Sequence, residues 1–215
     1  MTATGIGAPV RRKEDQRFIT GAGRYTDDLN RPGQAHAYFL RSPHAHALIR
    51  GIDASRARAM PGVVAVLTGE DLARDGVGGL ICGWMIHSKD GTPMKAGPHP
   101  ALAQGKVRYV GDHVAVVIAE TLAQARDAAE AIEVSYDVLP AVVEAVAAQK
   151  PGAPQVHEAA ADNTVFRWHL GDKAATDAAF ARAAHVTRLD LVNNRLVPNP
   201  MEPRAAIGDY DPGTD

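Results

Sequence analysis

The stretch HVAVVIAETLAQARDAAEAIEVSYDVLP, residues 113–140, decides the expected fold of this chain. It begins with a continuous apolar run of strand length at 113–119, which is typical of a buried strand. A helical pattern follows, and the segment 133–138 then alternates between apolar and polar residues, as a strand with one solvent-facing side does. A strand, a helix and a second strand in so few residues predict a βαβ unit.

The helix in this stretch carries its own start signal. Thr121 and Gln124 are spaced to form a capping box, in which each side chain satisfies a free backbone N–H at the helix start. The apolar stripe of the helix repeats at spacings of three and four residues and is therefore expected to face the core. The stripe consists of Leu122, Ala125, Ala129 and Ile132.

Three further strands are expected upstream, at 34–41, 45–52 and 63–68. The last of them is a continuous apolar run rich in β-branched residues, so we expect both of its faces to be covered. Between the second and third strands, Asp53 is a plausible N-cap for a short helix that ends at a Pro-Gly pair. Strands and helices in this order indicate an α+β fold class.

The chain divides into parts that differ in composition. The expected parts are an N-terminal arm at 1–18, an α+β domain at 19–147, a linker containing Pro and Gly at 148–164, and the start of a second domain at 165–215. The second domain is expected to contribute a helix at 177–184 and two strands, at 185–199 and 201–211. Within the first domain, the glycine-rich segment 76–106 predicts a long loop of the kind that is functional or covers a partner.

Composition excludes several classes of function. The 215 residues carry a net charge of -2 and only 5% aromatic residues, which disfavours nucleic-acid binding. The single cysteine, Cys82, excludes a disulfide within the chain and a cysteine-only metal site. No apolar run approaches the ~20 residues of a membrane span, and the N-terminus has no apolar signal-peptide core. These features favour a cytoplasmic protein without a membrane span.

Several small motifs have both a chemical and a structural interpretation. The glycine pairs at 5–7 and 21–23 do not follow a strand or precede a helix, so simple turns are favoured over nucleotide loops. His44 and His46 would share one face of a strand, but a third metal ligand is missing nearby, and the same holds for His87 and His99 in the long loop. Cys82 lacks an adjacent base, so burial as a small apolar group is expected.

The segment PNPMEPRA, residues 198 to 205 around Glu202 and Arg204, concentrates polar groups after an expected strand. Glu202 and Arg204 are two residues apart and could form an ion pair across a turn, or could line a site or face a partner. Both interpretations stay open. These two residues are the candidates for cofactor binding, and the sequence offers no catalytic or metal-ligating residue.

The order of blocks along the chain resembles the start of a known family. The blocks are GAGRY at 21–25, SPHAHA at 42–47, PGVVAVLT at 61–68, VGDHVAVVIAET at 110–121 and MEPR at 201–204. Together they resemble the molybdenum-binding large subunit of the xanthine dehydrogenase, aldehyde oxidase and aerobic carbon monoxide dehydrogenase family, from about residue 21 to the last. The bacterial carbon-monoxide-dehydrogenase-type and aldehyde-type subunits are the most similar branches.

The resemblance implies an α/β hammerhead domain at 19–147 and the first strands of a molybdopterin-binding domain at 165–215. It implies hydroxylation of an aldehyde or heterocycle with water-derived oxygen, or oxidation of carbon monoxide, by a molybdopterin cofactor. It also implies iron–sulfur and FAD partner subunits. The family's cofactor loops and catalytic glutamate lie beyond the matching blocks, so no catalytic residue is carried over.

The end of the chain, IGDYDPGTD at 207–215, has the pattern of a strand followed by a hairpin turn. We therefore expect the chain to be the N-terminal portion of a larger subunit: a laboratory truncation, a short reading frame or one chain of a split subunit. In that case it acts as a scaffold and is inactive alone. The alternative is a hammerhead module that acts by itself in binding or assembly. A small hydrolase is disfavoured because no Ser or Cys nucleophile has a matched base.

Overall fold

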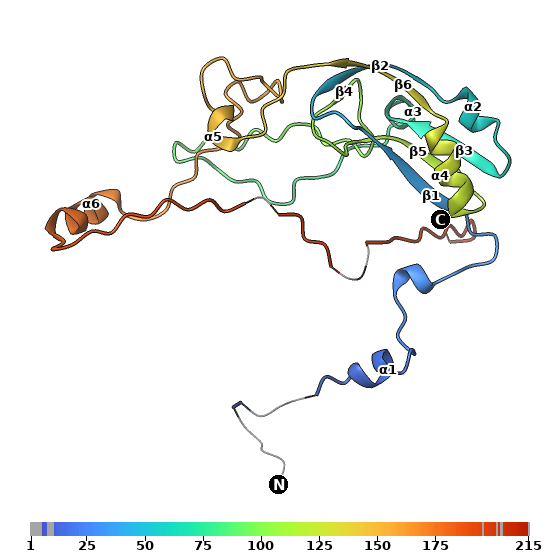
Figure 1. Ribbon diagram of the computed structural model, residues 1–215, viewed down its shortest axis with the longest axis horizontal. Coiled ribbons are helices and arrows are strands. Elements are labelled where there is room, and N and C mark those ends of the chain that lie inside the picture. The colour runs from blue at the N-terminus through green and yellow to red at the C-terminus, as the bar shows by residue number, and fades with distance from the viewer. Residues whose placement is uncertain (1–5, 8–10, 195, 201, 203, 215) are drawn as a thin grey trace, which may run out of the picture. The chain divides into compact units, whose positions relative to one another are not determined.

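The computed structural model describes residues 6–7, 11–194, 196–200, 202 and 204–214 (Figure 1). The chain separates into two compact units. The larger unit is Ala35–Val186, and the smaller unit combines Met1–Gln34 with Thr187–Asp215.

Two three-stranded antiparallel sheets form the larger unit. The first sheet has the order β1-β5-β3 and consists of β1 (His36–Arg41), β5 (His113–Ala119) and β3 (Val63–Thr68). The second has the order β4-β2-β6 and consists of β4 (Lys106–Val107), β2 (Ala47–Asp53) and β6 (Glu133–Val138). The strands expected from the sequence in the first domain are thus confirmed, with boundaries shifted by at most two residues.

The expected βαβ unit is wrong, although its three elements exist. Helix α4 (Leu122–Glu130) connects β5 of the first sheet to β6 of the second sheet. A βαβ unit needs two parallel strands in one sheet. Both edges of β5 are already occupied by β1 and β3, so β6 pairs with β2 instead.

The core lies between α4 and the first sheet, and it is built from small side chains. On the helix, Ala125, Ala128 and Ala129 are buried, and they pack with the fully buried Ala115 and Val117 of β5. Alanine lets the helix approach the sheet closely, and α4 lies against β1 and β5 (Figure 1).

Two details of this core differ from the expected pattern. Leu122 is 40% exposed, because it is the first residue of the helix and lies at the edge of the packed face. Ile52 and Val134 pack against both this core and a second cluster around Val107 and Val114. The two sheets therefore share a continuous apolar interior.

The helix starts are only partly as expected. The Thr121 hydroxyl accepts a hydrogen bond from the N–H of Gln124 but donates to the Gln124 side chain, so only half of the capping box forms. Asp53 accepts from the N–H of Ser55, yet the N-cap of α2 (Ser55–Arg58) is Ala54. A complete capping box occurs at α3 (Gly69–Arg74), between Thr68 and Asp71.

The third strand is an edge strand, which corrects the expectation that both of its faces are covered. Val66 of β3 is buried, but Val64 is 65% exposed. In the order β1-β5-β3, the strand β3 lies at the edge of the sheet and has β5 as its partner on one side. The β-branched run indicated a strand correctly but did not indicate its place in the sheet.

The long loop at 76–106 is confirmed, with one isolated bridge between His87 and Pro93. The expected linker at 148–164 follows α5 (Ala145–Ala148) and is folded around Asn163. The Asn163 backbone has φ 55°, and its side chain accepts from the N–H of Val156 and donates to the carbonyls of Ala148 and Pro154. Helix α6 (Lys173–Arg182) begins four residues before the expected helix.

The smaller unit contains α1 (Asp15–Ile19) and a 3-10 helix, η1 (Thr26–Asp28), so the expected arm is not wholly extended. Arg31 and Asp209 form an ion pair at 2.7 Å within it. The strands expected at 185–199 and 201–211 do not form in the described residues, because a strand needs a hydrogen-bonded neighbour. The expected turn at 211–214 does form.

Candidate functional site

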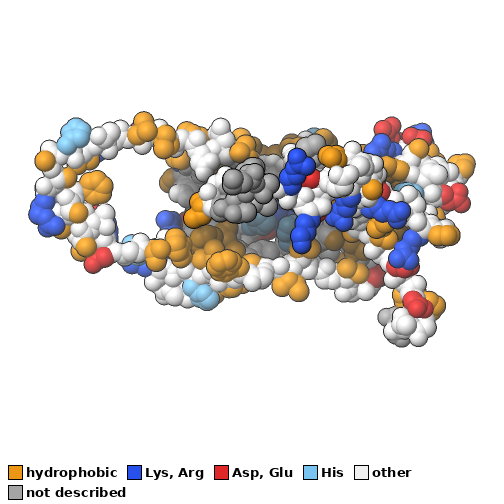
Figure 2. All heavy atoms as spheres, turned by 90° about the horizontal axis from the view of Figure 1, so that it is seen from below, with side chains coloured by type: hydrophobic (Ala, Val, Ile, Leu, Met, Phe, Trp, Pro, Cys, Tyr) orange, Lys and Arg blue, Asp and Glu red, His pale blue; other side chains and the backbone are white. Residues whose placement is uncertain are grey.

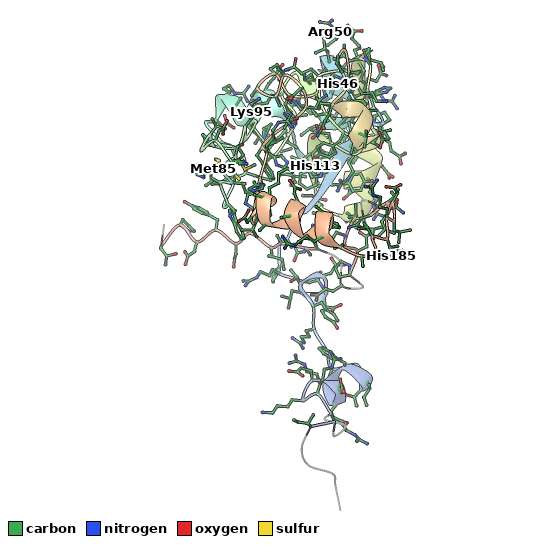
Figure 3. All side chains as sticks on the ribbon, turned by 90° about the vertical axis from the view of Figure 1, so that its left-hand side faces the viewer. His46, Arg50, Met85, Lys95, His113 and His185 are labelled. Carbon is green, nitrogen blue, oxygen red and sulfur yellow. The ribbon has the colours of Figure 1, made fainter. Side chains whose placement is uncertain are left out.

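The larger unit contains a pocket of about 430 Å³ that three distant segments enclose. The long loop supplies one wall, β4 and the residues after it supply the second, and the folded segment near 157–165 supplies the third. Its polar and charged lining residues are Cys82, Lys95, His99, Lys106, Arg108, Tyr109, Asp112 and His157. In the view of Figure 3, Lys95 and Met85 of the long loop lie to one side of the larger unit.

A basic pair forms the floor of the pocket. Lys106 and Arg108 flank the fully buried Val107, and their side chains are only 12% and 17% exposed. Both bind the carboxylate of Glu158, with Arg108 Nη2 at 3.3 Å from Oε2. The hydrogen bond from Lys106 is the main cause that lowers the pKa of Glu158 to about 2.

Two residues that line the pocket each have a buried side-chain nitrogen without a hydrogen-bond partner among the described residues: Arg108 Nε and His157 Nδ1. Burial, followed by the nearby Arg108 cation, lowers the pKa of His157, so this imidazole is neutral at pH 7. A Cβ added at Gly97 would lie 2.9 Å from His157 Nδ1, so the loop backbone closes tightly over the ring. Unpaired buried polar groups of this kind call for an explanation.

The structure corrects the expected burial of Cys82. The thiol is exposed, lines the pocket and donates to the carbonyl of Trp84 at 3.4 Å. Cys82 belongs to the long loop and not to the core, which is why its apolar character did not bury it. His99, which lies in the same loop, also lines the pocket, whereas His87 does not.

The two histidines of the SPHAHA block have different environments. His46 is 6% exposed, and its Nδ1 lies 2.8 Å from the carbonyl oxygen of Pro140. His44 packs edge-on against Tyr136 at 4.9 Å between ring centroids. Within the described part of the chain, no three His, Cys, Asp or Glu residues gather as a metal site would require.

The cofactor-binding candidates lie in the smaller unit. Glu202 and Arg204 are both exposed, and no ion pair joins these two described residues. Their neighbours Met201 and Pro203 lie outside the described residues, as does Gly5 of the first glycine pair. Gly21 of the second pair has φ 72° directly after α1, as a turn residue does.

Sequence reasoning missed the pocket residues Lys106, Arg108 and His157. A signal was present, since K-V-R on a strand places two cations on one face and an apolar residue on the other. His157 lies about fifty residues further along the chain, and no local pattern indicates that it packs there. None of the described helices is long and apolar enough to cross a membrane.

Comparison with known proteins places this fold. Residues 20–140 match the family described as aldehyde oxidase and xanthine dehydrogenase, a/b hammerhead domain. Residues 156–215 match the molybdopterin cofactor-binding domain. The first match alone spans more than half of the 215-residue chain.

Curated relatives match the chain over most of its length. The chain is 39% identical to the carbon monoxide dehydrogenase large chain of Afipia carboxidovorans, over 96% of this chain and 26% of the relative. It is 37% identical to the nicotine 6-hydroxylase large subunit of Paenarthrobacter nicotinovorans, over 98% of this chain and 25% of the relative. The chain thus spans about a quarter of the length of these curated relatives.

Solved structures agree with the family matches. A Cu,Mo-CO dehydrogenase structure matches with a TM-score of 0.66 and 37% identity, over 86% of this chain and 23% of that chain. Quinoline 2-oxidoreductase from Pseudomonas putida 86 matches with a TM-score of 0.58 and 42% identity, over 70% of this chain and 18% of that chain. The fold, the family matches and these relatives together show that the chain belongs to the aldehyde oxidase and xanthine dehydrogenase family.

Proposed function

We propose that this chain is the N-terminal portion of a molybdenum hydroxylase large subunit and that it supports the cofactor domain without being catalytic alone. The hammerhead match and the molybdopterin-domain match follow one another along the chain, in support of this proposal. The complete enzyme would oxidise a small molecule: an aldehyde, a heterocycle or carbon monoxide. Relatives named for carbon monoxide and for nicotine are both similar to it, so the substrate class stays broad.

One observation carries the proposal. Apolar side chains near the end of the chain are largely exposed, and they lie inside the segment that matches the molybdopterin domain. They are Leu189, Leu191, Val192, Leu196 and Val197, each more than 70% exposed. Exposed apolar runs of this kind mark surfaces that a partner covers. Figure 2 shows hydrophobic side chains at the surface on one face of the molecule.

The described residues do not by themselves form a molybdopterin site. Glu202 and Arg204 are exposed and are not joined to one another, so they would need further groups around them to hold a cofactor. The oxidation chemistry would be supplied by the molybdopterin cofactor. We therefore derive no catalytic step from this chain, and we assign it the role of positioning the remainder of the molybdenum subunit. Iron–sulfur and FAD subunits are the further partners we propose.

The domain boundaries belong to the same proposal. The hammerhead domain would span 19–147, a linker 148–164, and the cofactor domain would begin at 165. In the structure the segment near 157–165 is attached to the hammerhead through Glu158, so the linker would act as a fixed spacer. A fixed spacer would orient the cofactor domain.

The test is to tag this chain in its source cells, purify the native complex, and measure its molybdenum content and subunit masses. We expect molybdenum together with iron–sulfur and flavin-containing chains. Recovery of the chain alone, without metal, would contradict the proposal. It would favour the second candidate, a hammerhead module that acts in binding or assembly.

The second candidate rests on the larger unit having a core of its own. A self-sufficient module would not need residues 187–215, so their removal would leave its partner binding intact. If the proposed scaffold role is correct, the same deletion would abolish recovery of molybdenum with the tagged chain.

A further inference from the structure

We propose that residues 156–167 form a strap that Glu158 anchors on the hammerhead, and that this strap and the long loop 76–106 open and close as one unit. The strap belongs to the segment that matches the molybdopterin cofactor-binding domain, whereas the loop belongs to the segment that matches the hammerhead domain. The coupling joins these two matched segments. It depends on contacts within the larger unit and not on the proposed function.

The anchor of the strap is an ion pair between an exposed acid and two mostly buried cations. The side chains of Lys106 and Arg108 are 12% and 17% exposed, whereas that of Glu158 is 71% exposed. Among the described residues, Glu158 supplies the one carboxylate that forms a salt bridge with either cation. Detachment of the strap would leave both cations without this partner, and removing one member of a mostly buried ion pair is unfavourable. The ion pair therefore favours the docked strap.

A seam of hydrogen bonds joins the strap to the loop. The Lys89 N–H donates to the carbonyl of Arg167 at 3.0 Å. The Lys95 N–H donates to the carbonyl of Val165, also at 3.0 Å. In the opposite direction, the Arg167 N–H donates to the Ser88 hydroxyl oxygen at 3.2 Å. Each segment thus satisfies backbone groups of the other, so separating them would leave backbone groups of both segments unpaired.

Close packing holds the start of the strap against the same loop. A Cβ added at Gly97 of the loop would lie 2.9 Å from His157 Nδ1. The loop backbone therefore lies directly against the residue that precedes the anchor, which accounts for the burial of this nitrogen. The loop contacts the strap near both of its ends.

The loop depends on these contacts because it has no interior of its own. The structure describes every residue from 76 to 101, and none of them is buried. Large apolar side chains of the loop are exposed, among them Leu80, Ile81 and Trp84 at 66%, 93% and 82%. Segments with few buried apolar contacts open at low free energy, and contiguous segments open as cooperative units. The strap is therefore the element that keeps the loop closed.

The experiment is amide hydrogen exchange, measured by NMR on the 15N-labelled 215-residue chain and on its Glu158→Gln variant, which keeps the shape of the side chain and removes its charge. We expect the Lys89 and Lys95 amides of the loop to exchange about tenfold faster in the variant. The Arg58 amide in α2 should exchange at an unchanged rate, because its opening breaks no contact of the strap. The control is Glu133→Gln, the same change at an exposed residue of β6, which should leave the loop amides unchanged.

A second pair of variants tests the coupling from the loop side. A Cβ added at Gly79 would lie 2.7 Å from the carbonyl oxygen of His99, whereas one added at Gly78 would meet nothing within 4 Å. Gly79→Ala therefore disturbs the loop without touching the strap, and Gly78→Ala is its matched control. Because coupling between two segments is reciprocal, we expect Gly79→Ala to speed the exchange of the Val156 amide, which binds the Asn163 side chain within the strap, and Gly78→Ala to leave it unchanged.

Faster exchange of the strap alone in Glu158→Gln, with unchanged loop amides, would overturn the proposal, because the two segments would then open independently. Unchanged exchange in both segments would overturn it as well. If Glu158→Gln does not fold, the pair Gly79→Ala and Gly78→Ala decides, and equal exchange of the Val156 amide in these two variants rejects the coupling. These measurements use the 215-residue chain alone, so their outcome is independent of whether the native complex contains molybdenum.

Discussion

Val117, in the central strand β5 of the first sheet, is fully buried in the core that the sheet forms with helix α4. Replacing Val117 by a shorter residue removes apolar contacts. The surrounding alanines cannot replace these contacts, because their side chains are too short to fill the space. We expect Val117→Ala to lower the free energy of unfolding by about 2 kcal/mol. Urea denaturation of the whole chain measures this.

The matched control for that variant is Val64→Ala on the edge strand β3, where the side chain is 65% exposed. The same chemical change there should lower the free energy of unfolding by less than about 0.5 kcal/mol. Equal effects at the two positions would mean that the interior described here is not the stabilising core.

Asp71 is the second residue with a measurable role. Its carboxylate accepts from the N–H and the hydroxyl of Thr68 and from the guanidinium of Arg74. These bonds, with that from the Thr68 N–H first and that from Arg74 second, lower the pKa of Asp71 from 3.8 to about 2. A lowered folded-state pKa stabilises the fold above the unfolded value and loses this effect as the pH falls through the folded value. The contribution should therefore disappear between about pH 4 and pH 2.

We expect Asp71→Ala to lower the free energy of unfolding by about 1 kcal/mol at pH 7. The difference from the wild-type chain should shrink as the pH is lowered through that window, and denaturation curves at several pH values measure it. Asp75→Ala is the control, because its side chain is 59% exposed and Asp75 stands at the C-terminal end of α3, outside the N-terminal capping box. A difference that stays constant with pH would contradict the capping role of the carboxylate.

At the scale of the element, helix α4 has an amphipathic sequence pattern, but the residues that it buries in the core are all alanines. Ala128 is fully buried against the sheet, and Ala123 lies exposed on the same helix. Ala128→Leu would force extra atoms into a packed face, and we expect it to destabilise the chain by about 1–3 kcal/mol. Ala123→Leu should change stability by less than about 0.5 kcal/mol. Thermal unfolding followed by circular dichroism distinguishes the two variants.

The folded segment around Asn163 gives a second prediction at this scale. The Asn163 side chain holds three backbone groups together, and its positive φ suits asparagine or glycine. Asn163→Gly keeps the backbone conformation and loses the bonds, whereas Asn163→Ala loses both. We expect limited proteolysis to cut the segment 148–164 about tenfold faster in both variants, and faster still in Asn163→Ala, as loss of more than 1 kcal/mol of local stability would cause. Unchanged cleavage would mean that the segment is held by other contacts.

Local patterns predicted the elements of this fold better than their pairing. The strand at 113–119 and the helix after it were expected correctly because burial and periodicity are written in neighbouring residues. The pairing of β6 with β2 depends on which edges other strands have already taken, and no local pattern records that. For the same reason the sequence could not predict that Lys106 and His157 line the same pocket. The exposure of Cys82 could not be predicted either, because it depends on the path of the long loop.

At the scale of the whole molecule, the two family matches and the exposed apolar residues at 189–197 make a joint prediction. The larger unit has its own interior, so a chain that ends at Val186 should keep it. The 215-residue chain carries the exposed apolar run in addition, and unpaired segments of this kind promote association.

We therefore expect the 215-residue chain to self-associate in sedimentation velocity experiments at micromolar concentration. The chain ending at Val186 should sediment as a monomer, with an unchanged circular dichroism spectrum per folded residue.

A third variant isolates the cause of the association. Replacing Leu189 and Leu191 by Ser in the 215-residue chain removes apolar surface without shortening the chain, and should shift the population toward monomer. These leucines are 78% and 81% exposed, so the replacement removes no contact from the core of the larger unit. If all three chains are monomers, the apolar run does not act as an uncovered interface, and the scaffold proposal loses the observation that carries it.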